Sequence, residues 1–327
     1  MEVNFVEFRF AVILLLHSNV ETLSQWPNKT KYELVEKRLN KERYFGALDN
    51  ELHPDPRYPI YITPENADEI INRLSFSSMQ ELRLRKKPFT FVVEGIVGAG
   101  KTTMLSTFQK YPYIDVLPEP VDKWTNLEGI DMLNLALTNP RRWGLAQEMY
   151  GVLTVLDEHL RSVGLIRGME RSVHSARFIF TEAFWMMGQM SNVEYTILDN
   201  WYRLLNNEMK KSPTGFDLTA DLIVYLQTDP KTALNRIKDR GRPEEKGIQL
   251  SFLESLHSLH ENWLIHKNGT HSDNFPAKMV IVINTTENLE MMMEVYEKFA
   301  DRIWNIVPGE LKSICYQQTI NRRNNRK

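Results

Sequence analysis

The sequence predicts an α/β fold, in which a five-stranded parallel sheet is flanked by helices and preceded by an extension. Short apolar runs alternate with longer helical stretches, which is the pattern of βαβ units. One of the runs leads directly into a glycine-rich loop and a helix, a combination typical of phosphate-binding folds. The chain has 327 residues, of which 42% are hydrophobic and 25% are charged, so it is long enough for one large domain plus the extension.

The expected strands are short runs of aliphatic and aromatic residues bounded by turn or polar residues. They are the run that begins at Phe89, then Ile114–Leu117, Leu165–Arg171, Asp221–Leu226 and Lys278–Asn284. The expected helices are Asn66–Leu84, Met104–Lys110, Arg142–Arg161, His174–Met187, Val193–Lys211, Pro230–Asp239, Gln249–His266 and Leu289–Ile306. In the third of them an apolar stripe is formed by Leu145, Met149, Leu153 and Leu156. The alternation implies a parallel sheet with the Phe89 strand at its centre.

The glycine-rich loop reads Gly95-x-x-x-x-Gly100-Lys101-Thr102, a complete P-loop pattern. Its glycines allow backbone N–H groups to point at a phosphate, and the following helix adds a positive dipole. Lys101 is expected to reach the β- and γ-phosphates, and the Thr102 hydroxyl to bind Mg²⁺. The alternative is a glycine-rich turn that matches the P-loop pattern by chance. The strand expected before the loop argues against this alternative. The candidate ATP-binding residues of the loop are Gly95, Gly98, Ala99, Gly100, Lys101, Thr102 and Thr103.

The charge balance and the cysteine count restrict the partners and the compartment. The formal net charge of −2 argues against a nucleic-acid binder that relies on bulk positive charge. Cys315 is the only cysteine, so no intramolecular disulfide can form, and this fits a reducing compartment. We therefore expect a cytoplasmic protein; a mitochondrial location is less favoured and a nuclear one stays open.

The N-terminal region, residues 1–86, carries no recognisable chemistry. Its apolar run Phe8–Leu16 is too short to span a bilayer. Glu2 and Glu7 precede the first cation, Arg9, which argues against a signal peptide and against a mitochondrial transit peptide. We expect the run to pack as a strand or helix on the main domain, and we expect no membrane partner.

A second candidate site residue follows the strand Ile114–Leu117, in the segment Pro118–Trp124. Glu119 comes at the carboxyl end of that strand, where an acceptor hydroxyl would approach a γ-phosphate held by the P-loop. The flanking prolines keep the chain extended and so restrict the direction of the Glu119 side chain. The alternative is an ordinary acidic residue of a surface loop. Trp124 is equally compatible with the core and with a wall against which a base stacks.

Six segments, in this order, resemble the deoxyribonucleoside kinase family: EGIVGAGKTT, PEPVDKW, MERSVHSARFIF, DLIVYLQTDP, RGRPEEKGIQLSFL and LHENWLIH. The resemblance runs from about Phe89 to about Ile306, and several motifs in register make it specific. It implies a P-loop kinase fold with an arginine-bearing lid. It also implies transfer of a phosphoryl group from ATP, with Mg²⁺, to the 5′-hydroxyl of a deoxynucleoside, and a homodimer formed through a helix pair.

The resemblance assigns the catalytic roles to Glu119, Arg171 and Lys101. Glu119 matches the general base that acts on the 5′-hydroxyl, and Arg171 matches the arginine that orients this base and neutralises developing charge. Thr102 and Glu170 match residues at the magnesium. These roles suit phosphoryl transfer, in which cations surround the γ-phosphate and one carboxylate holds the nucleophile.

The resemblance also assigns the lid and the substrate pocket. Lid arginines that close over ATP match Arg236, Arg240 and Arg242, and Glu245 matches the carboxylate that binds the 3′-hydroxyl of the sugar. An Arg-Gly-Arg run taken alone would instead be a solvated turn. The candidate substrate-binding residues are Trp124, Gln147, Glu148, Gly151, Arg171, Ala176, Phe180 and Glu245.

Three positions depart from the family pattern. Glu148 aligns with the glutamine that reads the base, Gln147 with the aromatic residue that stacks on it, and Leu137 with a tyrosine that shares the 3′-hydroxyl. A shift of one residue would place Gln147 in the role of the glutamine. That shift rotates the side chain by about 100° around the helix, so a bulge would be needed, and we prefer the ungapped alignment.

The change to Glu148 leads to two hypotheses about the base. An ionised glutamate offers acceptors only, and guanine presents two adjacent donors to it. The small Gly151 and Val155 lie on the same helix face, so deoxyguanosine or deoxyinosine would gain most. If Glu148 instead stays protonated, it offers a donor and an acceptor as glutamine does, and thymidine remains a substrate.

Two classes of function remain open, an active deoxynucleoside kinase with altered base recognition and a non-catalytic descendant that binds nucleotide or serves as a structural subunit. The P-loop lysine, the base and the lid arginines are all present, which favours the active enzyme. A nucleoside monophosphate kinase would share the P-loop but would not explain the Glu-Pro-Val-x-Lys-Trp and His-Glu-x-Trp segments.

Residues 87–308 are therefore expected to form the kinase domain, and residues 309–327 a basic, polar tail. Because the first expected strand begins near Phe89, a chain that starts near Gln80 is expected to fold and to bind ATP.

Overall fold

The computed structural model describes residues 59–74, 88–161, 163–211, 218–242, 245–266 and 276–307, with the side chains of all of these except 208–211. All of them belong to one compact unit, residues 48–327. The strand or helix expected at 8–16 and the tail expected at 309–327 lie outside the described residues.

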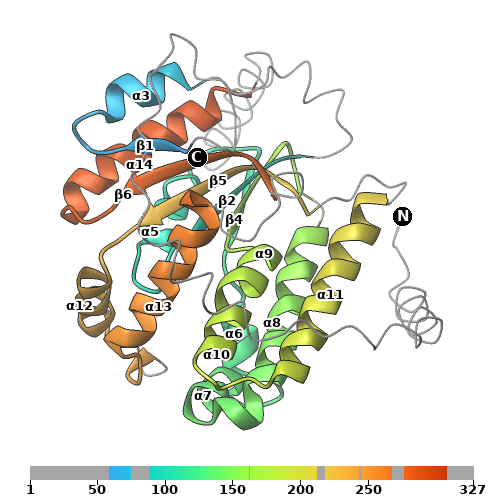
Figure 1. Cartoon of the computed structure of the whole chain (residues 1–327). Coiled ribbons are helices and arrows are strands. Elements are labelled where there is room, and N and C mark those ends of the chain that lie inside the picture. The colour runs from blue at the N-terminus through green and yellow to red at the C-terminus, as the bar shows by residue number, and fades with distance from the viewer. Residues whose placement is uncertain are drawn as a thin grey trace, which may run out of the picture. The chain divides into compact units, whose positions relative to one another are not determined.

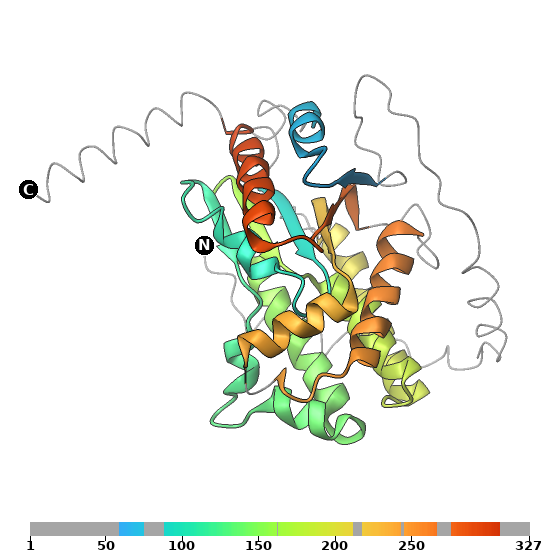
Figure 2. The ribbon, with the colours of Figure 1, turned by 90° about the vertical axis from the view of Figure 1, so that its left-hand side faces the viewer.

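Six parallel strands form one sheet in the order β1-β6-β5-β2-β4-β3 (Figures 1 and 2). They are β1 (Ile60–Ile62), β2 (Phe89–Glu94), β3 (Ile114–Leu117), β4 (Ile166–Glu170), β5 (Ala220–Gln227) and β6 (Ala277–Asn284). The strand before the P-loop, β2, lies between β5 and β4, and every one of its residues is buried. The predicted α/β class and the inner position of this strand are therefore confirmed.

Helices flank the sheet, with α14 on one side of the strands and α13 on the other (Figure 2). The helices are α3 (Ala67–Arg73), α5 (Lys101–Ser106), α6 (Val121–Thr125), α7 (Met132–Thr138), α8 (Pro140–Leu160), α9 (Val173–Ser175), α10 (Glu182–Met186), α11 (Asn192–Lys211), α12 (Pro230–Arg240), α13 (Leu250–His260) and α14 (Leu289–Trp304), with the π-helical segments η2 (Ala176–Thr181) and η4 (Glu261–Ile265). The two helices α6 and α7 are absent from the sequence prediction, because elements this short show no clear helical period. No helix in the described ranges is long and apolar enough to cross a membrane.

The sixth strand, β1, comes from the region that the sequence prediction places outside the sheet. Ile60 and Ile62 are buried, whereas Tyr61 between them is exposed. Ile60 pairs with Ile281 of β6. The prediction of five strands is therefore one too few, because three residues after a proline are too short a run to show alternation.

Helix α3 follows β1 along the chain and lies beside α14 (Figure 1). Its apolar residues Ile70 and Ile71 are buried, and so is Leu74, which follows the helix. The Leu74 carbonyl oxygen accepts a hydrogen bond from Arg302 Nε of α14 at 2.9 Å. The described helix ends at Arg73, so the predicted helix Asn66–Leu84 is not continuous through Leu74, and its part from 75 to 84 lies outside the described residues.

The buried face of α8 differs from the predicted apolar stripe. Leu156 is buried, but the Leu153 side chain is 54% exposed, and Leu145 and Met149 are only partly buried. The polar residues of α8 that are buried are Gln147, Glu148, Thr154 and His159. The stripe rule fails here because Gln147 and Glu148 line a cavity rather than a close-packed core.

Candidate active site

A cavity of about 350 Å³ lies at the carboxyl ends of β2, β3 and β4. These three strands are neighbours in a parallel sheet, so the segments that follow them meet at one edge. Further walls come from helices α6, α7, α8, α10 and α13, from η2 and from the lid after α12. The predicted site residues that line the cavity are Gly98, Gly100, Lys101, Thr102, Thr103, Glu119, Trp124, Gln147, Glu148, Gly151, Glu170, Arg171, Ala176, Phe180, Arg240, Arg242 and Glu245.

Three predicted ATP-binding residues do not line this cavity. Gly95 has a φ of +147°, and a Cβ there would lie 2.8 Å from a backbone oxygen of β5. Ala99 is fully buried. Arg236 Nη2 donates to the carbonyl oxygens of Thr285 at 2.7 Å and Glu287 at 3.0 Å. In this structure the Arg236 guanidinium therefore holds the connection between β6 and α14 rather than facing the cavity.

Besides Gly95, two further P-loop glycines have positive φ angles, Gly98 at +82° and Gly100 at +96°. A Cβ at Gly98 would lie 2.6 Å from a carbonyl oxygen of α12, so no other residue fits there without displacing that helix. Lys101 is buried and donates from Nζ to the Ile96 carbonyl oxygen at 3.1 Å. Burial, together with the nearby Arg171, lowers the pKa of Lys101 to about 8. The loop thus holds a desolvated cation, and a phosphate would stabilise its charged form.

Thr102 and Glu170 bring three side-chain oxygen atoms together next to the P-loop. The Thr102 hydroxyl lies 3.1 Å from each carboxylate oxygen of Glu170. Such groups suit Mg²⁺, which is usually held by one or two protein groups together with water and phosphates. Across the described ranges, no group of three or more His, Cys, Asp or Glu side chains could hold a metal ion. A magnesium ion here would therefore need nucleotide phosphates and water as further ligands.

Glu119 and Arg171 meet as a close ion pair. Arg171 Nε lies 2.9 Å from Glu119 Oε1, and the arginine side chain is only 4% exposed. Arg171 has a left-handed backbone with a φ of +64°, which costs a non-glycine residue about 1–2 kcal/mol. Its guanidinium also lies over the Phe180 ring, 4.6 Å from the centroid. Nη1 of this guanidinium is buried and has no hydrogen-bond partner within the described part of the chain.

The lid residues contact one another in this structure. Arg240 Nη2 donates to both carboxylate oxygens of Glu245, at 2.6 and 2.7 Å. Arg242 Nη1 lies 3.6 Å from the same carboxylate. Glu245 is therefore held by two partly exposed arginines, and it must exchange at least one of these contacts before it can bind a sugar hydroxyl.

The opposite part of the cavity is lined by Trp124, Leu137, Gln147 and Glu148. Trp124 Nε1 donates to Thr154 Oγ1 at 2.8 Å, so Trp124 belongs both to the packed interior and to the cavity wall. Helix α8 is continuous here, and both Gln147 and Glu148 face the cavity without a bulge. Gln147 Oε1 is buried and has no hydrogen-bond partner among the described residues.

Burial raises the pKa of Glu148 to about 8. A hydrogen bond with Thr181 and the charge of Arg171 act in the opposite direction, but burial outweighs both. The Glu148 carboxyl is therefore mostly protonated at neutral pH.

Four polar residues in or near this cavity are absent from the sequence prediction of the site: Glu94, Ser172, Ser175 and Thr181. Glu94 could have been noticed, because an acidic residue that ends an otherwise apolar buried strand needs a compensating environment. The two serines and the threonine carry no such signal, since residues of this type are common at helix starts.

A family model described as deoxynucleoside kinase matches residues 91–308. The chain belongs to the deoxynucleoside kinase family. It is 42% identical to the human protein named mitochondrial thymidine kinase 2 over 221 residues, which are 67% of this chain and 79% of the relative. It is 32% identical to human deoxycytidine kinase over 253 residues, which are 70% of this chain and 94% of the relative.

Membership of this family makes the chain an enzyme that phosphorylates deoxynucleosides, and it implies ATP as the phosphate donor. The resemblance read from the six sequence segments is thereby confirmed, together with the kinase activity that it implied.

Proposed function

We propose that this deoxynucleoside kinase uses Mg²⁺-ATP to phosphorylate the 5′-hydroxyl of pyrimidine deoxynucleosides, with thymidine as the preferred substrate. The observation that carries the proposal is the Glu119–Arg171 ion pair, which lines the same cavity as Lys101 and Glu148. One part of this cavity thus offers cations for phosphate, and another part offers a group that can read a base. The name of the 42%-identical relative, a thymidine kinase, supports the choice of thymidine.

In the proposed reaction, Glu119 accepts a hydrogen bond from the 5′-hydroxyl and takes its proton as the oxygen attacks the γ-phosphorus. The new oxygen–phosphorus bond forms as the bond to the β-phosphate oxygen breaks, and that electron pair leaves with ADP. Lys101 and Arg171 stabilise the charge on the phosphoryl oxygens. Mg²⁺ held by Thr102 and Glu170 would add positive charge at the phosphates.

The buried setting of Glu148 favours thymidine over the purines. A protonated carboxyl donates from its O–H and accepts at its C=O, so it can pair with O4 and N3–H of thymine as a glutamine would. Guanine requires two acceptors, which only the ionised form provides. Burial raises the pKa of Glu148 to about 8, so Glu148 is mostly protonated below that pH. The hypothesis of a shift toward deoxyguanosine therefore applies only above that pH.

We expect the preference for thymidine over deoxyguanosine to fall as the pH rises through the Glu148 pKa of about 8. Above that value each pH unit lowers the protonated fraction about tenfold, so kcat/KM for thymidine should fall by a similar factor relative to deoxyguanosine. The measurement is the ratio of the two kcat/KM values from about pH 6.5 to about pH 9, because a ratio cancels ionisations that affect both substrates equally.

Glu148→Gln is the matched control, since it keeps one donor and one acceptor but cannot titrate. This variant should retain thymidine phosphorylation and show a ratio that does not change with pH. A parent ratio that is also constant would remove Glu148 from base recognition. Failure of the parent to consume ATP with any deoxynucleoside would instead support the non-catalytic alternative.

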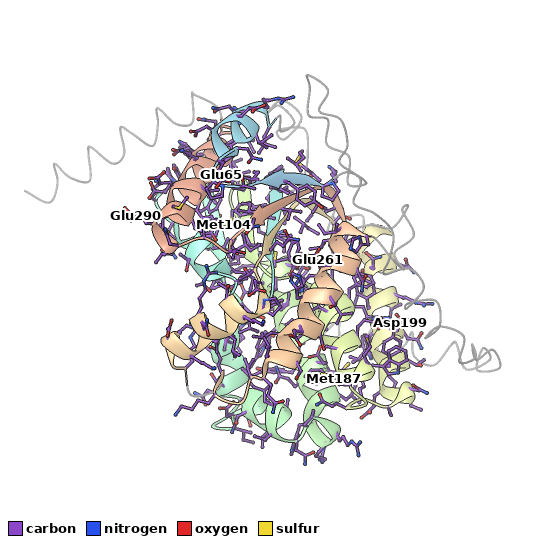
Figure 3. The ribbon with its side chains drawn as sticks, turned by 60° about the vertical axis from the view of Figure 1, so that its left-hand side comes forward. Glu65, Met104, Met187, Asp199, Glu261 and Glu290 are labelled. Carbon is purple, nitrogen blue, oxygen red and sulfur yellow. The ribbon has the colours of Figure 1, made fainter. Side chains whose placement is uncertain are left out.

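We also propose that the protein functions in a reducing compartment such as the cytoplasm and that it forms a homodimer. Several large apolar side chains on α8, α10, α11 and the adjoining turn are exposed, and they are Leu153, Met186, Met187, Val193 and Ile197. Met187, which follows α10, and Asp199 of α11 lie away from Glu290 of α14 (Figure 3). Light scattering of the parent should give the mass of about two chains. Val193→Glu places a charge in the exposed apolar surface, so the mass of this variant should be that of one chain. A parent mass of one chain would contradict the dimer.

A further inference from the structure

Glu94 is a fully buried acid at the carboxyl end of β2, directly before the P-loop. Its Oε1 accepts a hydrogen bond from Ser172 Oγ at 2.8 Å. Its Oε2 has no hydrogen-bond partner anywhere in the described ranges. A carboxyl group this deeply buried costs free energy unless its surroundings compensate, so its neighbours need to be identified.

Ser172 connects Glu94 to the residue that pairs with Glu119. It follows Arg171, whose backbone is left-handed, and it caps the next helical turn. The Ser172 hydroxyl accepts from the Ser175 backbone N–H at 3.3 Å, and the Ser175 hydroxyl accepts from the Ser172 N–H at 3.0 Å. Glu94 thus braces the turn that directs Arg171 toward the cavity.

Two charged groups act on Glu94, and they come from different segments. Arg171, at the end of β4, and Lys101, at the start of α5, both stabilise the ionised carboxylate, whereas burial opposes it. Burial outweighs these cations and raises the pKa of Glu94 to about 7. His260 of α13 is also buried near the same two cations, and its lowered pKa keeps it neutral. The ionised form of Glu94 therefore depends on Lys101 and Arg171 remaining available to it.

We propose that Glu94 is a positioning residue that holds Arg171 and Lys101 ready for ATP and takes up a proton when the phosphates bind between these two cations. The inference rests on the proposed function, in which both cations contact the γ-phosphate. Phosphate charge competes with Glu94 for the two cations and repels its carboxylate, so a proton from solvent moves to the carboxyl. Binding that takes up a proton becomes weaker as the pH rises.

The test is calorimetry of a non-hydrolysable ATP analogue with Mg²⁺ near pH 7, in two buffers with different ionisation enthalpies. A carboxyl with a pKa of about 7 is half-protonated there, so the parent should take up as much as about half a proton per site. Glu94→Gln keeps an acceptor for Ser172 but cannot titrate, so its proton uptake should be a small fraction of that of the parent. Asp122→Asn, at an exposed position outside the cavity lining, should leave the uptake unchanged.

Positioning is tested separately by Ser172→Ala, which removes the hydrogen bond to Glu94 but leaves its carboxyl in place. We expect kcat to fall about tenfold with little change in ATP affinity, because Arg171 loses its support rather than its charge. A lower melting temperature with unchanged kcat would show a purely structural role and overturn the positioning part.

Equal proton uptake by the parent and Glu94→Gln would overturn the proton-linked part, whereas a parent that fails to bind the analogue would overturn the proposed function itself. If Glu94→Gln does not fold, the pH dependence of ATP-analogue binding by the parent tests the proposal. Its affinity for the analogue should fall as the pH rises through about 7, and a constant affinity would contradict the proposal.

Discussion

Glu119→Gln is expected to lower kcat by about a hundredfold or more while ATP still binds. The variant keeps the volume of the side chain but loses the proton acceptor for the 5′-hydroxyl. The P-loop, Lys101 and Thr102 are unaffected, so the affinity for ATP should change only slightly. The measurements are kcat with thymidine under saturating ATP and the dissociation constant of an ATP analogue.

Asp122→Asn is a suitable control for Glu119→Gln. Asp122 lies three positions further along the same segment, and its side chain is exposed and outside the cavity lining. It should retain the activity of the parent. Turnover of Glu119→Gln close to that of this control would remove Glu119 from the role of the general base.

A chain that starts at Gln80 is expected to lose stable folding, which reverses the expectation drawn from the sequence. Such a chain lacks β1 and α3 and leaves β6 as an uncovered edge strand. The buried side chains that it removes are Ile60, Ile62, Ile70, Ile71 and Leu74. At about 1.5 kcal/mol or more for each, their loss is comparable with the whole free energy of unfolding of a typical domain.

A chain that starts at Arg57 is the matched control, since it keeps β1 and α3. The two shortened chains should differ in solubility, and thermal unfolding should be cooperative only for the longer one. Equal melting temperatures would show that β1 and α3 contribute little to the stability of the sheet.

Much of the fold could be predicted from local sequence patterns. The strand β3 has the predicted bounds, and β2, β4, β5 and β6 lie where their apolar runs place them. The P-loop glycines, Glu119 and Arg171 could be placed near one another because parallel strands bring their carboxyl ends to one edge. These features depend on short-range residue order, which is what a sequence displays directly.

The tertiary structure alone decided which faces and charges are buried. The three-residue β1 is stabilised by pairing with β6, more than 200 positions away, and no local pattern reveals that pairing. The sequence does not determine the protonation state of Glu148 or Glu94, whereas burial in the structure raises the pKa of both. Their desolvation is caused by helices and strands that are distant along the chain, so only the assembled fold determines whether they carry a charge.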